Sequence, residues 1–163
     1  MYDKILVPLD GSDLSEIAVA HAAALSRMSG ADIVLVQVID AVSHIIAQTT
    51  PATIEPMPSG GITSAVAEQA VQGQRQQAQA NLDAVQARIE AEGAGGAVTT
   101  EVVEGSPGPA LEQALADQGC DIVVMATHGR SGFKRAILGS VADHLVRNSP
   151  GASVLLVEPA DAV

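Results

Sequence analysis

A basic, glycine-rich stretch of the chain has the residue types of a phosphate-binding site. It contains Thr127-His128-Gly129-Arg130-Ser131-Gly132-Phe133-Lys134-Arg135 and is followed by Leu138-Gly139-Ser140. Glycines let backbone N–H groups approach an oxyanion closely, and a serine at a helix start adds a hydroxyl beside the positive end of the helix dipole. Three of the eight basic residues of an otherwise acidic chain lie here. The pattern predicts an anion cradle with basic side chains at its mouth; the alternative is an exposed loop that happens to be basic.

A second place for chemistry follows the first apolar run of the chain. There the sequence continues as Pro8-Leu9-Asp10-Gly11-Ser12. A turn and a helix cap would be enough to explain Gly11 and Ser12. Asp10 is harder to explain in that way, because a carboxylate that ends a buried strand is costly without a partner. We therefore expect Asp10 to have a partner or a role in a site.

Several catalytic signatures are missing from the sequence. It contains no GxxxxGK[ST], GxGxxG, GxSxG or HExxH motif and no pair of cysteines for zinc. His128 has no evident nucleophile or orienting acid around it, so anchoring of the loop is favoured over base catalysis. We predict no catalytic residue and no metal held by the protein itself.

The two motifs need a scaffold that brings the ends of two strands together. Runs rich in Val, Ile and Leu predict strands buried on both faces, at 4–9, 33–39, 122–126 and 154–157, with a weaker one at 98–103. Helical patterns alternate with them, from near Ser12 to Gly30, over 65–92, from Pro107 to Gly119, and over 138–148. This order predicts a doubly wound α/β sandwich that binds ligands beyond the carboxyl ends of its strands.

Periodicity also predicts which side chains are buried. The inward face of the first helix is expected to hold Leu14, Ile17, His21, Ala24, Leu25 and Met28, with His21 as a satisfied core histidine. In the long helix the predicted buried residues are Ala78, Leu82, Val85 and Ile89. Its expected outer face is rich in glutamine, at Gln72, Gln74, Gln76, Gln77 and Gln79. Cys120 is expected to be a small buried side chain.

One stretch shows no regular pattern. Residues 40–64 contain no Lys or Arg, three prolines and the sequence Ser59-Gly60-Gly61. A connection of this length is usually a lid, a partner-binding loop or a disordered segment. The chain 1–163 is therefore predicted to form a single domain with a flexible insertion at about 40–64.

Composition limits the classes of partner. The 163 residues include 19 acidic and 8 basic side chains, giving a net charge of -11, and 1% are aromatic. Such a chain repels a phosphate backbone and lacks a base-stacking platform, so we expect no nucleic-acid partner. The sequence has no long apolar run, so we expect no membrane span. It shows no leader in which charged residues are followed by an apolar stretch, so we expect no secretory signal and a cytoplasmic location.

The motifs together point to a known family. Pro8-Leu9-Asp10-Gly11-Ser12, Ala126-Thr127-His128-Gly129 and Gly139-Ser140 resemble the universal stress protein family, and the resemblance extends from Tyr2 to Val157. ATP-binding members carry the pattern G-x2-G-x9-G-[ST]. The resemblance implies a parallel sheet of five strands in the order 3-2-1-4-5. It also implies ATP, or alternatively AMP or ADP, between the ends of strands one and four, with Mg²⁺ carried by the nucleotide.

The candidate nucleotide-binding residues are Pro8, Leu9, Asp10, Val38, Ala126, Gly129, Arg130, Gly139, Ser140 and Val141. By resemblance, Gly129, Gly139 and Ser140 match phosphate-contacting positions. Asp10 matches the stretch near the adenosine, and the backbone of Val38 matches the position that contacts the adenine edge.

Ala126 departs from the pattern, which has Gly at this position. With φ below zero, the alanine methyl would only crowd the ligand. With a positive φ, the substitution would cost about 1–2 kcal/mol and weaken or abolish binding.

The resemblance favours a stress-response sensor or adaptor that forms a homodimer through the apolar edge strand 153–157. Hydrolysis of ATP should be slow without an evident base, and slow autophosphorylation could use Ser140, Ser131 or Thr127. One alternative is a nucleotide-free module that binds an unknown protein through residues 40–64. Another is a nucleotide-dependent hydrolase or transferase whose product formation depends on Asp10.

Overall fold

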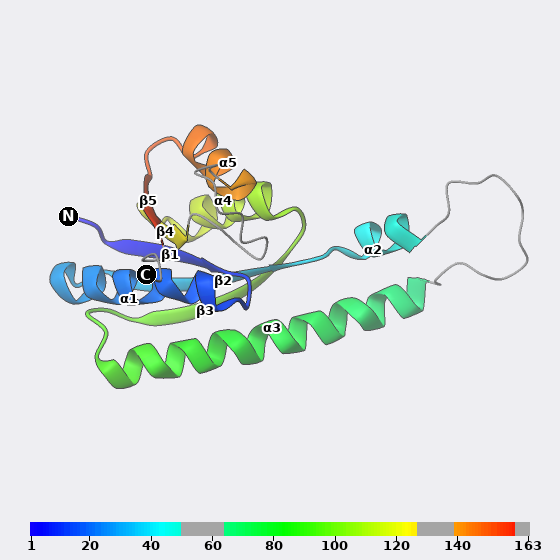
Figure 1. Ribbon diagram of the computed structural model, residues 1–163, viewed down its shortest axis with the longest axis horizontal. Coiled ribbons are helices and arrows are strands. Elements are labelled where there is room, and N and C mark those ends of the chain that lie inside the picture. Colours follow the sequence, from blue (N-terminus) through cyan, green and yellow to red (C-terminus); the bar gives the residue numbers. More distant parts are fainter. Residues whose placement is uncertain (50–63, 127–138, 159–163) are drawn as a thin grey trace, which may run out of the picture.

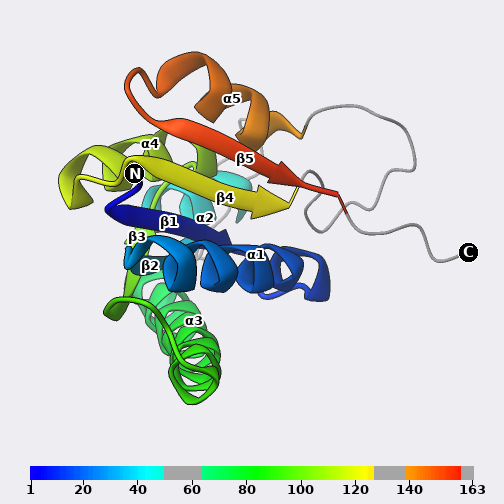
Figure 2. The same ribbon diagram turned by 90° about the vertical axis from the view of Figure 1, so that its left-hand side faces the viewer.

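The strands form one parallel sheet with the first strand at its centre. The computed structural model describes residues 1–49, 64–126 and 139–158. Its strands are β1 (Lys4–Leu9), β2 (Asp32–Ile39), β3 (Val98–Glu104), β4 (Ile122–Ala126) and β5 (Ser153–Val157). They lie in the order β3-β2-β1-β4-β5, and every neighbouring pair is parallel (Figures 1 and 2). The predicted doubly wound fold and its strand order are confirmed.

Helices cover both faces of the sheet. They are α1 (Asp13–Ser29), α2 (Val42–Thr49), α3 (Ser64–Glu92), α4 (Pro107–Gln118) and α5 (Ser140–Asn148). On one face, Val7 of β1 shares a core with Leu82 of α3, and α1 packs there too. On the other face, Leu6 shares a core with Leu111 of α4 and Leu145 of α5. Successive strand residues point to opposite faces, so a sheet covered on both sides needs uninterrupted apolar strands.

The buried face of α1 differs from the predicted one. Its buried positions carry small side chains, at Ser15, Ala18, Val19, Ala22, Ala23 and Ser26. Met28 is 81% exposed and His21 is also exposed, so the prediction of a core histidine is wrong. Small side chains let the helix lie close to the sheet, and the larger Ile17 and Leu25 then pack at its flank, only partly buried.

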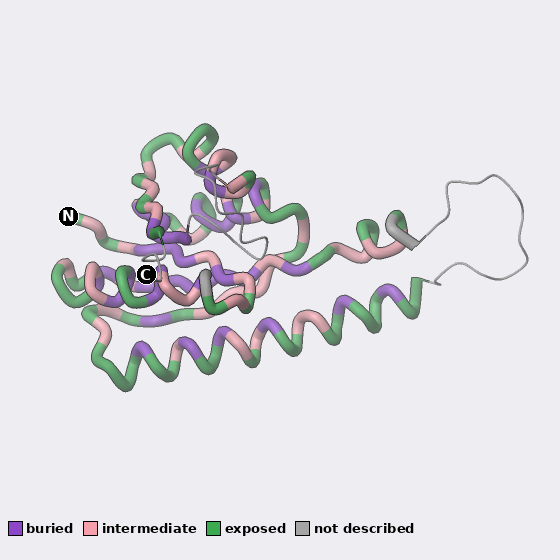
Figure 3. Tube along the Cα trace, in the orientation of Figure 1, coloured by how far each residue is buried: buried purple, intermediate pink, exposed green. Residues whose placement is uncertain are grey.

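Part of α3 overhangs the sheet together with α2 (Figure 1). The predicted buried residues of α3 are confirmed at Ala78, Leu82, Val85 and Ile89. In Figure 3 buried residues recur at intervals along α3, also in the overhanging part, where Ile45 of α2 and Val71 of α3 share an apolar cluster. The expectation that 40–64 is irregular is therefore wrong for 42–49, because α3 offers an apolar surface to these residues. Residues 50–63 lie outside the described part of the chain.

The two edges of the sheet differ in what covers them. Arg75 Nη1 of α3 donates to the Val102 carbonyl of β3 at 3.3 Å, and Gln86 Nε2 donates to the Val98 carbonyl at 2.8 Å. These bonds occupy outward-facing carbonyls of the β3 edge. β5 forms the opposite edge, where Leu155 is 36% exposed. Within the described residues, β5 is thus the edge that is more open to pairing with another strand. No described helix is both long and apolar enough to cross a membrane.

Candidate functional site

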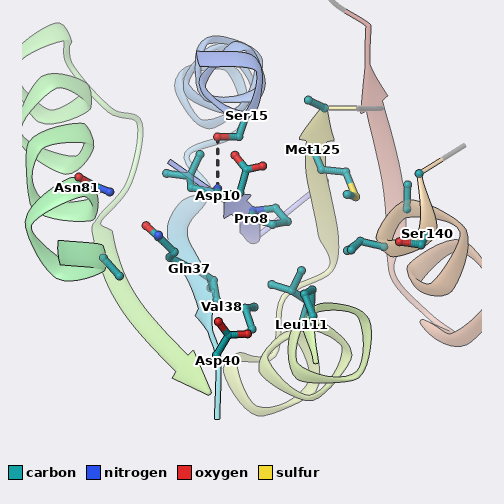
Figure 4. Close-up of a pocket in the computed structure, with 18 of the residues that line it drawn as sticks. Pro8, Asp10, Ser15, Gln37, Val38, Asp40, Asn81, Leu111, Met125 and Ser140 are labelled. Carbon is teal, nitrogen blue, oxygen red and sulfur yellow. Dashed lines mark hydrogen bonds between the residues drawn. The ribbon is translucent and has the colours of Figure 1, made fainter. Parts of the chain in front are cut away.

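A cavity of about 640 Å³ lies at the carboxyl ends of β1, β2 and β4 (Figure 4). This is the point where the strand order reverses, and the volume is in the range of small-molecule sites. Of the predicted site residues, the cavity brings together Pro8, Leu9, Asp10, Val38, Ala126, Gly139, Ser140 and Val141. The other two, Gly129 and Arg130, lie outside the described residues.

Asp10 is held at the cavity by the turn between β1 and α1. Its Oδ1 accepts a hydrogen bond from the Ser12 amide at 3.0 Å and another from the Ser12 hydroxyl at 2.5 Å. The Asp10 amide donates to Ser15 Oγ at 3.4 Å, the dashed line in Figure 4. Gly11 makes the turn with a φ of 76°, a left-handed conformation that favours glycine. The expectation that Asp10 has a partner is confirmed, and these bonds fix the orientation of its carboxylate.

The start of α5 faces the cavity from the β4 side. Gly139 is the N-cap of α5 and Ser140 is its first helical residue. Backbone amides at the positive end of this helix are therefore beside the cavity, where an anion would be stabilised.

Ala126 is the last residue of β4 and pairs with Val157 of β5. A strand has an extended backbone with φ below zero, which alanine adopts without strain. The φ of Ala126 is therefore below zero, which is the case in which the methyl group causes no strain and only occupies space at the cavity.

The cavity reaches both faces of the sheet, and its two sides differ in chemistry. The side toward α4 and α5, here called the apolar limb, is lined by Pro8, Val38, Leu111, Met125 and Val141. The side toward α3, here called the polar limb, is lined by Gln37, Asp40, Gln74, Gln77 and Asn81, of which the last three belong to α3 and Asp40 is hydrogen-bonded to Gln74. An apolar surface suits a flat ring system, whereas the polar limb suits groups that form hydrogen bonds.

The polar limb is not apparent from the amino-acid sequence. Gln74 and Gln77 belong to the glutamine-rich face of α3 that the helical pattern places in solvent, but the overhang of α3 brings them to the cavity. Gln74 Oε1 accepts a hydrogen bond from the Asp40 amide at 3.1 Å. The one available signal is Gln37, a polar residue inside the apolar run of β2.

No strong nucleophile or metal site appears among the described residues. Cys120 is buried, as predicted, and burial raises the pKa of its thiol to about 11. The thiol is therefore protonated and unreactive near neutral pH. Across 1–49, 64–126 and 139–158, no cluster of three or more His, Cys, Asp or Glu side chains could hold a metal ion. His128 lies outside these ranges.

The fold and the cavity define a doubly wound α/β protein with a cavity at its topological switch point, where proteins of this architecture bind ligands. Comparison with known families makes the class more specific, because the model of the universal stress protein family matches residues 1–158. The chain belongs to the universal stress protein family.

Individual relatives agree with this assignment. The universal stress protein MJ0531 of Methanocaldococcus jannaschii is 28% identical over 98% of this chain and 84% of its own length. The solved structure of MJ0577 has a TM-score of 0.79 and 25% identity, covering 99% of each chain.

Two further solved structures were determined with nucleotides. One is a universal stress protein in complex with cAMP, with a TM-score of 0.62, 23% identity and coverage of 96% of this chain and 97% of its own. The other is an Arabidopsis thaliana family member with AMP bound, with a TM-score of 0.59, 13% identity and coverage of 98% and 93%. At these identities the likeness to this chain is one of fold.

Proposed function

We propose that this protein is a cytoplasmic, homodimeric stress-response sensor or adaptor that binds ATP or another adenine nucleotide. The observation that carries the proposal is the cavity at the ends of β1 and β4, which Asp10 lines from one side and the start of α5 from the other. The relatives solved with cAMP and with AMP support an adenine nucleotide as the ligand class.

The two limbs and α5 suggest how the nucleotide would lie. The apolar limb offers Val38, Leu111 and Met125 as surface for the base. The amides at Gly139 and Ser140 would stabilise the phosphates, aided by Gly129 and Arg130 as the family resemblance implies. Mg²⁺ would be carried by the phosphates and would offset their charge in this acidic protein.

Efficient catalysis is not expected from this site. The Asp10 carboxylate accepts two hydrogen bonds from Ser12, and Asp40 Oδ2 accepts one from Gln74 Nε2 at 3.3 Å. No histidine is among the described residues that line the cavity. The described lining therefore offers only carboxylates, which are weak bases and are oriented by bonds within the protein. We expect hydrolysis or autophosphorylation at rates below about 1 s⁻¹.

The homodimer would form through β5. Its outer edge carries exposed Leu155 beside the partly buried Val154 and Leu156. An apolar edge strand of this kind is stabilised when it pairs with a second strand. The β3 edge is less suited, because Arg75 and Gln86 of α3 already bind its carbonyls.

A second candidate function is a nucleotide-free module that binds a protein through the insertion. The observation that favours it is the overhang of α2 and α3, which projects beyond the sheet (Figure 1). Val66 of α3 is 51% exposed to solvent. Deletion of residues 50–63 separates the two candidates. The nucleotide sensor should keep most of its affinity for ATP after the deletion, whereas the interaction module should lose its partner.

Calorimetric titration of nucleotide-stripped protein with ATP and Mg²⁺ tests the main proposal. Gly139→Trp would fill the cavity beside α5 and should abolish binding. Gly73→Trp is a matched control, because Gly73 of α3 is exposed and a Cβ added at this position meets nothing within 4 Å. Micromolar binding that survives Gly73→Trp and disappears in Gly139→Trp supports the proposal. No binding by folded wild-type protein contradicts it and favours the interaction module.

A further inference from the structure

The side chain of Gln37 is buried in the cavity with an unused acceptor. Gln37 lies near the end of β2, is 9% exposed and lines the polar limb (Figure 4). Its Oε1 is shielded from solvent and has no hydrogen-bond partner among the described residues. Native proteins seldom bury an amide oxygen without a donor, because the group has lost its bonds to water. The position therefore calls for a donor from outside the described chain.

The cavity reaches the side chain of Gln37, but Oε1 is turned away from the open space, so a ligand donor would bond to Oε1 only after the amide rotates about its terminal side-chain bond. Gln37 and Asn81 line the main cavity and also an adjoining one of about 170 Å³ between α1 and α3. Asn81 Oδ1 accepts a hydrogen bond from Gln77 Nε2 at 3.0 Å, which orients its amide beside Gln37. The polar limb thus has room for part of a ligand beside the Gln37 amide.

The charge of the polar limb limits what it can bind. Two carboxylates, Asp10 and Asp40, line the main cavity, and its described lining contains no Lys or Arg. In the adjoining cavity the charge of Arg88 is paired with Glu16 at 3.0 Å. Phosphates would be repelled there and would be more stable at the start of α5. A neutral group with O–H or N–H donors fits the carboxylates and the free acceptor of Gln37.

We propose that the polar limb is a subsite for the hydrogen-bond donors of the nucleoside half of the ligand, with Gln37 Oε1 as the accepting atom. The donor is a hydroxyl of the sugar or the exocyclic amine of the base. The inference rests on the proposed binding of an adenine nucleotide. It adds a specificity-determining residue that lies on the side of the cavity away from the start of α5.

Gln37→Met tests the proposal, because methionine has a similar shape and cannot accept a comparable hydrogen bond. Removing an unpaired buried acceptor should stabilise the ligand-free protein, raising Tm by about 2–4 °C. The same change should weaken ATP binding about tenfold. A residue with only a structural role would not combine these two effects. Gln72→Met, at an exposed position of α3, is the matched control and should alter neither quantity.

Ligand analogues identify the donor. Titrations of wild-type and Gln37→Met protein would use ATP, 2′-deoxy-ATP, 3′-deoxy-ATP and inosine triphosphate, all with Mg²⁺. The analogue that lacks the relevant donor should bind wild-type protein about tenfold more weakly than ATP and should be unaffected by Gln37→Met. A deoxy analogue with this behaviour identifies a sugar hydroxyl, and inosine triphosphate identifies the base amine.

The outcomes separate this inference from the proposed function. If wild-type protein binds ATP and Gln37→Met binds it equally well, the subsite is wrong while nucleotide binding stands. A lower Tm for ligand-free Gln37→Met also overturns the inference, since the amide would then have a partner within the protein. If folded wild-type protein binds none of the nucleotides, both proposals fail.

Discussion

His144 of α5 and Glu112 of α4 are joined by a hydrogen bond of 2.7 Å between Nε2 and Oε2. The imidazole also lies against Gly108 of α4, where an added Cβ would be 2.8 Å from His144 Cγ. This contact holds two helices together on the α4 and α5 face of the sheet. Because α5 begins with Gly139 and Ser140, the packing of α4 against α5 also sets the position of the proposed phosphate-binding end.

Gly108→Ala tests this relationship. The new methyl would collide with the imidazole of His144 and force α4 and α5 apart, which should lower the free energy of unfolding by about 1–3 kcal/mol. Chemical denaturation measures the change, and calorimetry with ATP should show weaker binding. The His144→Ala background removes the colliding ring, so Gly108→Ala should cost much less there. Equal costs in both backgrounds would contradict the proposed contact.

Val154→Pro tests the dimer edge. The Ser153 amide donates to the Asp121 carbonyl, so strand alternation turns the Val154 amide toward the open edge of β5. Proline at 154 removes that outward donor without breaking a bond to β4. Sedimentation analysis should show a shift from dimer to monomer.

Thr100→Pro is the matched control for the dimer experiment. Val98 and Val102 of β3 direct their carbonyls to α3, so alternation places the Thr100 amide on the outer edge of β3. This variant should stay dimeric. A wild-type monomer, or loss of the dimer in Thr100→Pro alone, would exclude β5 as the interface.

Cys120 should make stability depend on alkaline pH. Burial raises its pKa from 9.0 to about 11 in the folded protein. The thiol of the unfolded chain therefore loses its proton at a lower pH than the buried thiol of the folded protein. The contribution of this difference to the free energy of unfolding is complete below pH 9 and is lost as pH rises toward 11. The total loss from this group is about 3 kcal/mol.

Cys120→Ala removes that titration while keeping a small apolar side chain. Denaturant unfolding at intervals of pH should show a shallower decline above pH 9 in the variant than in wild-type protein. The two proteins differ only at this position, so the difference between their profiles reports the thiol. Parallel pH profiles would show that burial does not perturb the thiol.

Much of the fold is predictable because its determinants are local. Uninterrupted apolar runs such as Ile33 to Ile39 identify strands buried on both faces, and Ser12 identifies a helix start that the structure confirms. The buried face of α1 is mispredicted because the prediction places the larger apolar side chains, such as Met28, toward the core. Close packing of the helix on the sheet instead buries alanines such as Ala18 and Ala22.

The candidate site is predictable only in part, for a related reason. Asp10 and Ser140 stand out because each belongs to a motif continuous in sequence. The polar limb depends on where α3 crosses the end of β2, which brings Asn81 near Gln37 from a distant part of the chain. Helical periodicity gives no information on such a crossing, so glutamines that line a cavity look like solvent-facing ones.

Ala126→Gly tests whether the departure from the family pattern affects binding. The Ala126 methyl lies at the cavity, in an extended backbone that favours alanine over glycine. Its removal should lower the free energy of unfolding by about 0.5–1 kcal/mol, through the greater entropy of glycine in the unfolded chain. The affinity for ATP should rise two- to threefold at most, because the space gained is one methyl group. Calorimetry and denaturation of the same samples measure both effects. A rise of a hundredfold or more would mean that Ala126 obstructs the site, and the nucleotide-free alternative would then be the better description of the natural protein.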